Sequence, residues 1–353
     1  MKIAITADLH LTNRKDHPER FHALENILEQ IREEQISTLI IAGDLFDEAS
    51  RNYAEFDQLC SSDPHAGIAF FVIPGNHDAF ISEAQITAKN VKVITQPVIE
   101  SFEPNLQLLF LPYKKETTMG EKIAGVAADL VPNEWILISH GDWSEGIREP
   151  NPFEPGVYMP LTRTDLDNFK PAEVLLGHIH KPMDAGRVHY VGSPCGLNSL
   201  ETGRRRFLVL DTETRTLQSK IVETDFIYFN VSLIVLPLKD ERAYLEQQIA
   251  NEIEKWGLAE AEKPRVRLQV KVRGYTADKR ALQETIGAGF RHFKFYKNRR
   301  PDLAEVSTSE DQERGEIAER VSAWIEKVSW PARDPQPTKA EALLQALHVI
   351  YGD

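Results

Sequence analysis

Five short apolar runs in the first 180 residues are each followed by side chains of the kind that bind metal ions. The runs cover residues 2–7, 38–42, 68–73, 135–139 and 174–176 and are rich in branched residues. Runs of this length predict strands that are buried on both faces of a layered α/β domain. Because open α/β sheets bind ligands beyond the carboxyl ends of their strands, we expect one functional site there.

The polar residues after these runs make up the inventory of a bimetallic site. In chain order they are Asp8 and His10, then Asp44, then Asn76 and His77, then His140, and finally His178 and His180. Divalent ions such as manganese, iron and zinc bind imidazole and carboxylate groups, and a pair of ions needs a bridging carboxylate. An extended backbone would point the side chains of Asp8 and His10 the same way, and the same holds for His178 and His180.

Each motif taken singly has an ordinary structural explanation. Asn, Asp and Gly dominate turns for backbone reasons, so a lone Asp-x-His or Gly-Asn-His sequence is more often a turn or a cap. Gly43, which precedes Asp44, would permit close backbone approach at a strand end. Because all five motifs stand at the ends of apolar runs, the pattern favours one shared site over five unrelated turns.

In this order the motifs resemble the signature of the calcineurin-like metallophosphoesterases. The matching segments are Asp-x-His at 8–10, Gly-Asp-x-x-Asp at 43–47, Gly-Asn-His-Asp at 75–78, a single His at 140 and Gly-His-x-His at 177–180. Gly-Asp-Leu-Phe-Asp at 43–47 and Tyr-Val-Gly-Ser-Pro at 190–194 are similar to the SbcD-type nuclease subunits of double-strand-break repair complexes. The resemblance implies an α/β fold: a layered β-sandwich core flanked by helices, a smaller α/β capping domain and a C-terminal helical tail.

The resemblance also implies a role for each site residue. One metal would bind to Asp8, His10, Asp44 and His180, and a second to Asp44, Asn76, His140 and His178. The two ions would be divalent, with Mn²⁺ expected, and Asp44 would bridge them. His77 would face the phosphate as a catalytic residue, and Asp47 would orient His77 through a hydrogen bond. Hydrolysis would then need no covalent enzyme intermediate.

The pattern of elements divides the chain into three segments. Residues 1–225 form the expected nuclease domain, 226–300 a capping domain, and 301–353 a linker with C-terminal helices. In the second segment, strands at 229–236, 265–272 and 293–296 alternate with helices at 240–256 and 277–286. The tail predicts two helices with capping boxes at Ser309 and Thr338 and a closing Gly352, separated by a proline-containing stretch at 330–337. These helices would either pack on their own domain or dock on a partner.

Charge is distributed unevenly along the chain. The net charge of -13 argues against a protein that coats nucleic acid, yet residues 261–300 hold twelve Lys or Arg against three acids. In that segment, four cations alternate with apolar residues and predict a basic strand face that contacts DNA: Arg265, Arg267, Lys271 and Arg273. The alternative is an ordinary amphipathic strand with a solvated face. The run at 204–206, Arg-Arg-Arg, predicts an exposed hairpin turn.

The remaining features place the chain among ordinary globular proteins. No apolar run approaches the ~18 to 20 residues of a membrane span, and no signal peptide is recognisable, so we expect a cytoplasmic protein without membrane contact. Cys60 and Cys195 lack the spacing of a zinc site and are expected to be reduced thiols.

Three functions are compatible with these motifs. The resemblance implies a metal-dependent DNA exonuclease or endonuclease, the nuclease subunit of an SbcCD-like DNA repair and recombination complex. Such a subunit would form a homodimer and assemble with an SbcC-like coiled-coil ATPase. A phosphomonoesterase or cyclic-nucleotide phosphodiesterase is the second hypothesis, because the same metal cage serves many phosphate esters. A DNA-end-binding scaffold with weak catalysis is the third.

Overall fold

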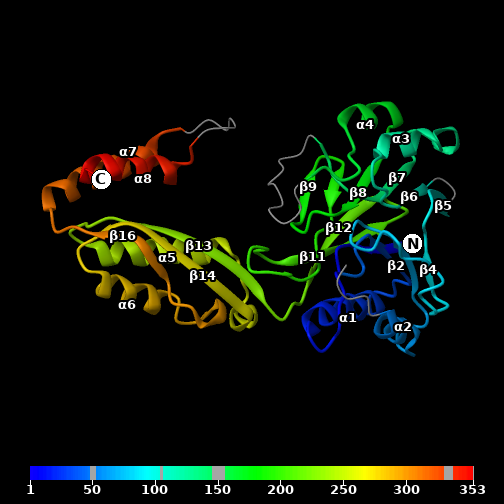
Figure 1. The fold of residues 1–353 in the computed structure, drawn as a ribbon, viewed down its shortest axis with the longest axis horizontal. Helices are drawn as coiled ribbons and strands as arrows, with labels where there is room; N and C mark the ends of the chain where they lie inside the picture. The colour runs from blue at the N-terminus through cyan, green and yellow to red at the C-terminus, as the bar shows by residue number, and fades with distance from the viewer. Residues whose placement is uncertain (48–52, 104–105, 145–155, 330–336, 353) are drawn as a thin grey trace. The chain divides into compact units, whose positions relative to one another are not determined.

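A computed structural model describes residues 1–47, 53–103, 106–144, 156–329 and 337–352 of the chain. Contacts between residues divide the chain into two compact units, Met1–Phe226 and Ile227–Asp353 (Figure 1). None of the described helices combines the length and the apolarity that a membrane span requires.

The first unit contains a six-stranded sheet built around the N-terminal strand. In spatial order its strands are β12 (Thr216–Val222), β11 (Arg205–Asp211), β1 (Lys2–Thr6), β2 (Thr38–Ala42), β3 (Ala69–Ile73) and β4 (Val91–Val93). The strands β1 to β4 are parallel, whereas β11 runs antiparallel to both of its neighbours. Every residue of β2 is buried, as expected for a central strand covered on both faces.

A second six-stranded sheet lies face to face with the first. In spatial order its strands are β5 (Val98–Glu103), β6 (Leu106–Leu111), β7 (Trp135–His140), β8 (Glu173–Gly177), β10 (Val188–Tyr190) and β9 (Met183–Ala185). Alternate residues of both sheets meet in one apolar core, where Ile5 and Ile40 belong to the same cluster as Phe110 and Ile138. The predicted layered core is therefore confirmed.

Helices cover the outer faces of this sandwich (Figure 1). The helices α1 (Pro18–Glu33) and α2 (Tyr53–Ser61) pack on the first sheet, and α3 (Met119–Ala124) and α4 (Arg163–Phe169) pack on the second. Pro18 at the first turn of α1 suits the helix because its φ is already fixed near the helical value. The short helix η1 (Ala127–Asp129) follows α3.

The second unit is built on a parallel sheet whose central strand is β14 (Val266–Thr276). One edge of β14 pairs with β13 (Ile227–Val235), and it also pairs with the short β15 (Lys294–Phe295) and with β16 (Asp302–Thr308). The helices α5 (Glu241–Lys255) and α6 (Lys279–Gly289) pack on one face of the sheet. The short helices η2 (Glu260–Arg265) and η3 (Tyr296–Asn298) precede β14 and follow β15.

The two C-terminal helices pack on their own unit. Residues of α7 (Gln312–Lys327) and α8 (Lys339–Tyr351) share an apolar cluster with Leu236 and Tyr275. The predicted capping box at Thr338 and Glu341 is confirmed, as is the left-handed Gly352 at the end of α8. The predicted cap at Ser309 is wrong, because Asp311 accepts the hydrogen bond from Arg314 N at the start of α7. Most of the predicted proline-containing separator, 330–336, lies outside the described residues.

Two features of the fold differ from those predicted from the sequence. The strand β16 was not anticipated, because most of its residues are exposed and polar and it lacks an apolar alternation. The run at 204–206 is not an exposed turn, because Arg205 and Arg206 begin the strand β11 and Arg205 is only 2% exposed. Its guanidinium is buried because it donates a hydrogen bond to the backbone oxygen of His180 at 2.7 Å.

Candidate metal centre

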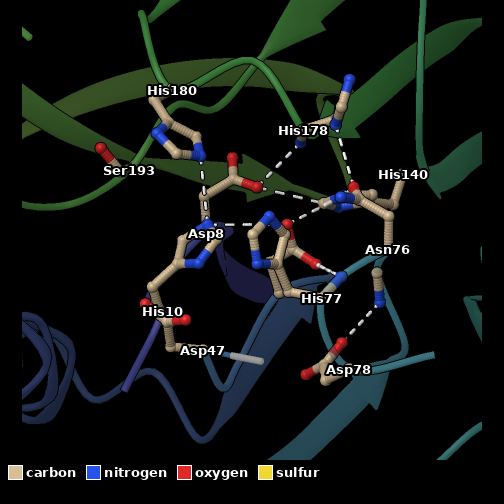
Figure 2. Close-up of polar contacts among 12 residues, drawn as sticks. Asp8, His10, Asp47, Asn76, His77, Asp78, His140, His178, His180 and Ser193 are labelled. Carbon is tan, nitrogen blue, oxygen red and sulfur yellow. Dashed lines mark hydrogen bonds and ion pairs between the residues drawn. The ribbon is translucent and has the colours of Figure 1, made fainter. Parts of the chain in front are cut away.

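The eight predicted side chains converge at the carboxyl ends of five strands of the first unit. Asp8 and His10 follow β1, Asp44 follows β2, Asn76 and His77 follow β3, His140 ends β7, and His178 and His180 follow β8. Figure 2 shows the labelled histidines gathered around Asp8 and Asn76. Residues that are up to 172 positions apart in the sequence therefore face one another.

Left-handed backbone conformations aim several of these side chains. The φ angles are 53° at Asp8, 45° at His10, 50° at Asp44 and 92° at His178. Non-glycine residues adopt such angles at a cost of about 1–2 kcal/mol each, and strained residues of this kind cluster at functional sites. The prediction of an extended Asp8–His10 segment is wrong, since both residues are left-handed.

Backbone hydrogen bonds between two loops support this strained geometry. The N–H groups of Asp8 and His10 donate to the carbonyl oxygens of Gly43 and Asp44 at 3.1 and 2.9 Å. The loop after β1 is thereby held against the loop after β2, which brings the Asp44 carboxylate beside the ligands of the first loop.

The first group of donors is made by Asp8, His10 and His180. One donor atom from each residue lies within 4.8 Å of the others. The Nε2 atoms of His10 and His180 are 3.1 Å apart, and Oδ2 of Asp44 lies 3.5 Å from His10 Nε2. Together with Asp44, this is the set that the resemblance assigned to one ion.

The second group surrounds Asn76. Its Oδ1 atom lies 2.8 Å from Nε2 of His140 and 3.0 Å from Nδ1 of His178. The Asp44 carboxylate also reaches this group, since its Oδ2 atom is 3.3 Å from His140 Nε2. Asp44 is thus shared by both groups, which is the position that a bridging carboxylate needs.

His178 and His180 do not point the same way, contrary to the expectation from an extended backbone. His178 lies against Asn76 in the second group, and His180 lies against His10 in the first. The left-handed φ of His178 separates the two rings, so the motif delivers one imidazole to each group.

The chemistry of the donor set fits divalent cations. Asp8 is fully buried, and in the described part of the chain no hydrogen bond reaches its Oδ2 atom. Leaving an anionic oxygen buried and unsatisfied is costly, and a bound cation would offset that cost. The surrounding atoms are carboxylate oxygens, an amide oxygen and imidazole nitrogens, which are ligands that transition metals prefer.

A neighbouring group at Nδ1 sets the tautomer of His140 and of His180. Nδ1 of His140 lies 3.1 Å from the carbonyl oxygen of Ala42, which can only accept, so Nδ1 carries the proton. Nδ1 of His180 lies 3.0 Å from the Glu201 carboxylate. When either ring is neutral, its lone pair is then on Nε2 and faces the donor groups, which is the arrangement of metal-binding histidines.

Burial and neighbouring charges shift the pKa values of the site residues in different directions. Burial lowers the pKa of His10 to about 3 and raises the pKa of Asp8 to about 6. Burial opposes a charge on His140, but the Asp44 carboxylate raises the pKa of that imidazole to about 10. Burial also opposes the charge of Asp44, yet the charge and the hydrogen bond of His140 hold the pKa of that carboxyl well below the usual range. His140 and Asp44 therefore form a buried ion pair in the metal-free protein.

His77 lies at the edge of the first group. Its ring packs edge-on against His10 with centroids 4.6 Å apart, and its backbone N–H donates to Oδ1 of Asp44 at 2.9 Å. A donor atom of His77 also lies within 4.8 Å of donors from His10 and Asp44. Asp47 accepts a hydrogen bond from Arg20 at 3.2 Å, and its predicted hydrogen bond to His77 stays a prediction.

Three buried or half-buried residues that support the site were not found from the sequence. Glu201 binds His180, Ser193 Oγ and the Leu197 N–H, so one carboxylate fixes the loop that follows β10. Arg205 lies 3.7 Å from Glu201 and holds the backbone of His180. The third is Asp78.

The Asp78 carboxylate ties together the loops after β2 and β3. It accepts hydrogen bonds from the N–H groups of Gly75 at 2.7 Å and Phe46 at 3.1 Å. Burial raises the pKa of Asp78 to about 6. Asp78 is the fourth residue of the Gly-Asn-His-Asp motif, and this position is the signal by which the sequence could have revealed it.

Glycine is required where the loops meet. A Cβ atom on Gly43, whose φ is +89°, would lie 2.1 Å from Nδ1 of His140. A Cβ atom on Gly75 would lie 2.1 Å from Oδ1 of Asp44. The expectation that Gly43 permits close approach beside Asp44 is confirmed, and the neighbour that requires it is His140.

The predicted basic strand face belongs to the second unit. Arg267, Lys271 and Arg273 alternate on β14 with buried apolar residues, whereas Arg265 ends the preceding η2. Lys271 and Arg273 form ion pairs with Glu305 on β16 at 2.5 and 3.0 Å. The Arg267 guanidinium donates to the backbone oxygens of Pro264 and Val266.

Three known proteins match this chain over part of its length. Exonuclease subunit 1 of Enterobacteria phage T4 is 28% identical over 233 residues, which cover 61% of this chain and 66%, just under two thirds, of that protein. Among solved structures, an archaeal phosphodiesterase matches 63% of this chain and 100% of its own length, with 14% identity and a TM-score of 0.34. A dimetal phosphatase from Danio rerio covers 59% of this chain and 91% of its own length, with 10% identity and a TM-score of 0.40. The sequence profile of the calcineurin-like phosphoesterases matches residues 1–204, and the chain therefore belongs to that family.

Proposed function

We propose that this chain is a two-metal phosphodiesterase that hydrolyses DNA as an exonuclease or endonuclease. The observation that carries the proposal is the position of Asp44, whose carboxylate is shared by two groups of buried donors. Paired sites of this kind serve hydrolysis of phosphate esters. The similarity to a phage exonuclease subunit favours DNA as the ester.

Each residue of the metal centre has a proposed role. Asp8, His10, Asp44 and His180 would hold one ion, and Asp44, Asn76, His140 and His178 the other. Two bound divalent ions, for which Mn²⁺ is our choice, supply charge that polarises the phosphate and lowers the pKa of water. His77 would donate a proton or a hydrogen bond to the phosphate, and Asp47 would orient His77.

Contacts to the DNA backbone are assigned to the basic segment of the second unit. Arg265, Arg267, Lys271 and Arg273 would contribute positive charge that attracts phosphates without reading sequence. Because Glu305 already neutralises part of the charge of Lys271 and Arg273, these two residues would attract phosphate less strongly than unpaired cations.

We further propose that the chain works in a complex, as a homodimer with an SbcC-like coiled-coil ATPase. The name of the phage relative describes that protein as a subunit. The helices α7 and α8 bury Ile325 and Leu347 against their own unit, yet Trp324 is 67% and Val349 is 75% exposed. Exposed large apolar side chains on a packed helical pair are suited to docking a second helix.

Incubation of the chain with linear duplex DNA and Mn²⁺ tests the function. We expect acid-soluble nucleotides to be released, and we expect Asp44→Asn to abolish the release because both ion sites lose a ligand. Cleavage of a chromogenic diester or a cyclic nucleotide without any cleavage of DNA would instead identify a small-molecule phosphoesterase. Tight DNA binding without cleavage of any ester would identify a DNA-end-binding scaffold.

A further inference from the structure

The sheet of the second unit has a break along one edge of β14. The strand β15 pairs with Arg267 and Leu268, and β16 pairs from Lys271 onward. In the described part of this sheet, neither strand is in register with Gln269 or Val270. Successive residues of a strand direct their backbone N–H and C=O groups to opposite neighbours, so one of these two residues directs its groups toward the break.

A cavity of about 380 Å³ opens at this break. Asn230 and Ser232 of β13, Gln269 of β14 and Phe295 of β15 are among the residues that line it, and we call the polar part formed by β13 and β14 its floor. We call this cavity the edge pocket. Its volume falls within the range of small-molecule sites, about 300–1,000 Å³, and its floor offers hydrogen-bonding groups of both kinds.

The positive charge available in the edge pocket comes from Arg299 and Arg300. Lys271 and Arg273 also line it, but Glu305 binds both. Arg299 and Arg300 are exposed, and no side-chain hydrogen bond or ion pair joins either of them to another residue in the described ranges. The carboxylate in the lining, Asp302, accepts a hydrogen bond from the Ala304 N–H. Two guanidinium groups are thus left to bind an anion.

We propose that the edge pocket binds one nucleotide of a single DNA strand. The phosphate lies at Arg299 and Arg300, because guanidinium groups bind phosphate oxygens in pairs. The base lies against the ring of Phe295, because bases stack on aromatic side chains, and its polar edge meets the floor at Gln269. A paired base cannot enter a cavity of this size without leaving the duplex, so the pocket selects an unpaired strand.

This inference rests on the proposed function, because DNA is its ligand. It extends that function by assigning a site for an unpaired strand to Arg299, Arg300 and Phe295, beside Lys271 and Arg273 of the predicted basic strand face. The binding measurement below is made in EDTA, where no hydrolysis occurs. An absence of strand binding by the edge pocket can therefore be distinguished from an absence of nuclease activity.

The experiment measures binding of a fluorescent oligothymidine to the full chain in EDTA by anisotropy. One variant, Arg299→Ala with Arg300→Ala, removes the phosphate contacts. A second variant, Ser232→Trp, fills the pocket from an exposed position of β13 and leaves every charge in place. The control, Arg242→Ala with Arg280→Ala, removes two exposed arginines that pair with Glu246 and Glu284 on α5 and α6, helices that cover the other face of the sheet.

Both pocket variants are expected to bind the oligothymidine at least about tenfold more weakly, because stacking and phosphate contacts are lost. The double arginine variant should also lower the slope of log K against log salt by about 0.7 for each phosphate contact removed. The control variant should bind like the wild type, and binding of a blunt duplex should change little in any variant.

Three results would overturn the proposal. The first is no binding of oligothymidine by the wild type. The second is wild-type binding by Ser232→Trp, which would mean that the arginines act as surface charge alone. The third is an equal loss of duplex binding, which would remove the selectivity for an unpaired strand. Loss of DNA cleavage in manganese with intact oligothymidine binding would count against the nuclease activity and not against the edge pocket.

Discussion

Nε2 of His140 lies 3.3 Å from Oδ2 of Asp44, and the opposite ring nitrogen of His140 faces the carbonyl oxygen of Ala42. Both nitrogens therefore face acceptors, and the metal-free protein needs a proton on Nε2. Burial opposes that proton, but Asp44 raises the pKa of His140 to about 10. A metal ion bound to Nε2 would take the place of the proton.

Metal binding is accordingly expected to release about one proton from His140 between pH 7 and 9. The affinity for Mn²⁺ should then rise about tenfold per pH unit in this window. Calorimetric titrations in buffers of different ionisation enthalpy count the protons released. His10 should contribute none, because burial lowers its pKa to about 3 and keeps it neutral. A proton count of zero at pH 8 would contradict the raised pKa of His140 in the metal-free protein.

The same shift makes the metal-free protein sensitive to alkali. The pKa of His140 is raised from 6.5, so its stabilising effect is complete below about pH 6.5 and is lost as the pH rises toward 10. Thermal unfolding in EDTA should show this decline, and saturating Mn²⁺ should reduce it.

Glu201 is expected to control metal affinity through His180. Its carboxylate lies 3.0 Å from Nδ1 of His180 and holds the ring in the tautomer that exposes Nε2. Replacing Glu201 by Gln should weaken Mn²⁺ binding by about 10–100-fold, the usual effect of losing such a partner. The matched control is Asp184→Asn, which changes a carboxylate of the same unit that pairs with His189 and Arg206. Equal affinities in the two variants would remove Glu201 from this role.

Replacement of His77 distinguishes a catalytic residue from a ligand. Its ring is close enough to His10 and Asp44 to join a metal site, whereas the proposed function has it face the phosphate. His77→Ala should keep Mn²⁺ affinity and lower kcat for DNA hydrolysis by about 10²–10⁴-fold, the range of general acid catalysis. Asp47→Asn should show a smaller loss of kcat. A large loss of Mn²⁺ affinity in His77→Ala would show that His77 binds an ion.

The convergence of the site could be predicted from the sequence because each ligand follows an apolar run. Once the runs at 38–42 and 135–139 form neighbouring layers of one sandwich, Asp44 and His140 are placed at the same edge. No residue pattern revealed the left-handed backbone of His178, because that conformation is imposed by contacts between loops. The extended-strand argument therefore identified the ligands but not how they are aimed.

The residues that support the metal ligands could not be predicted from the sequence, because tertiary contacts decide their roles. Glu201 is recognisable only by its contact with His180, 21 positions away in the sequence. Arg205 stands in a run of three arginines, which normally indicates a solvated surface, yet tertiary hydrogen bonds hold it inside. In both cases the interaction that decides the role joins distant parts of the chain.

The contact between Gly43 and His140 provides a test of how tightly the loops define the metal centre. Gly43→Ala combines a left-handed backbone, φ +89°, with a Cβ atom 2.1 Å from His140 Nδ1. Gly186→Ala is the matched control, because Gly186 is also left-handed, φ +65°, in the β9–β10 turn and its Cβ would meet no atom within 4 Å. The control should lose about 1–2 kcal/mol of unfolding free energy and keep its Mn²⁺ affinity.

Gly43→Ala should lose more stability and should bind Mn²⁺ at least about tenfold more weakly, because displacement of His140 breaks a ligand contact. Urea unfolding and Mn²⁺ titration of both variants measure the difference. Equal Mn²⁺ affinities would mean that His140 can shift without cost to the centre, which its close contacts with Asn76 and Asp44 argue against.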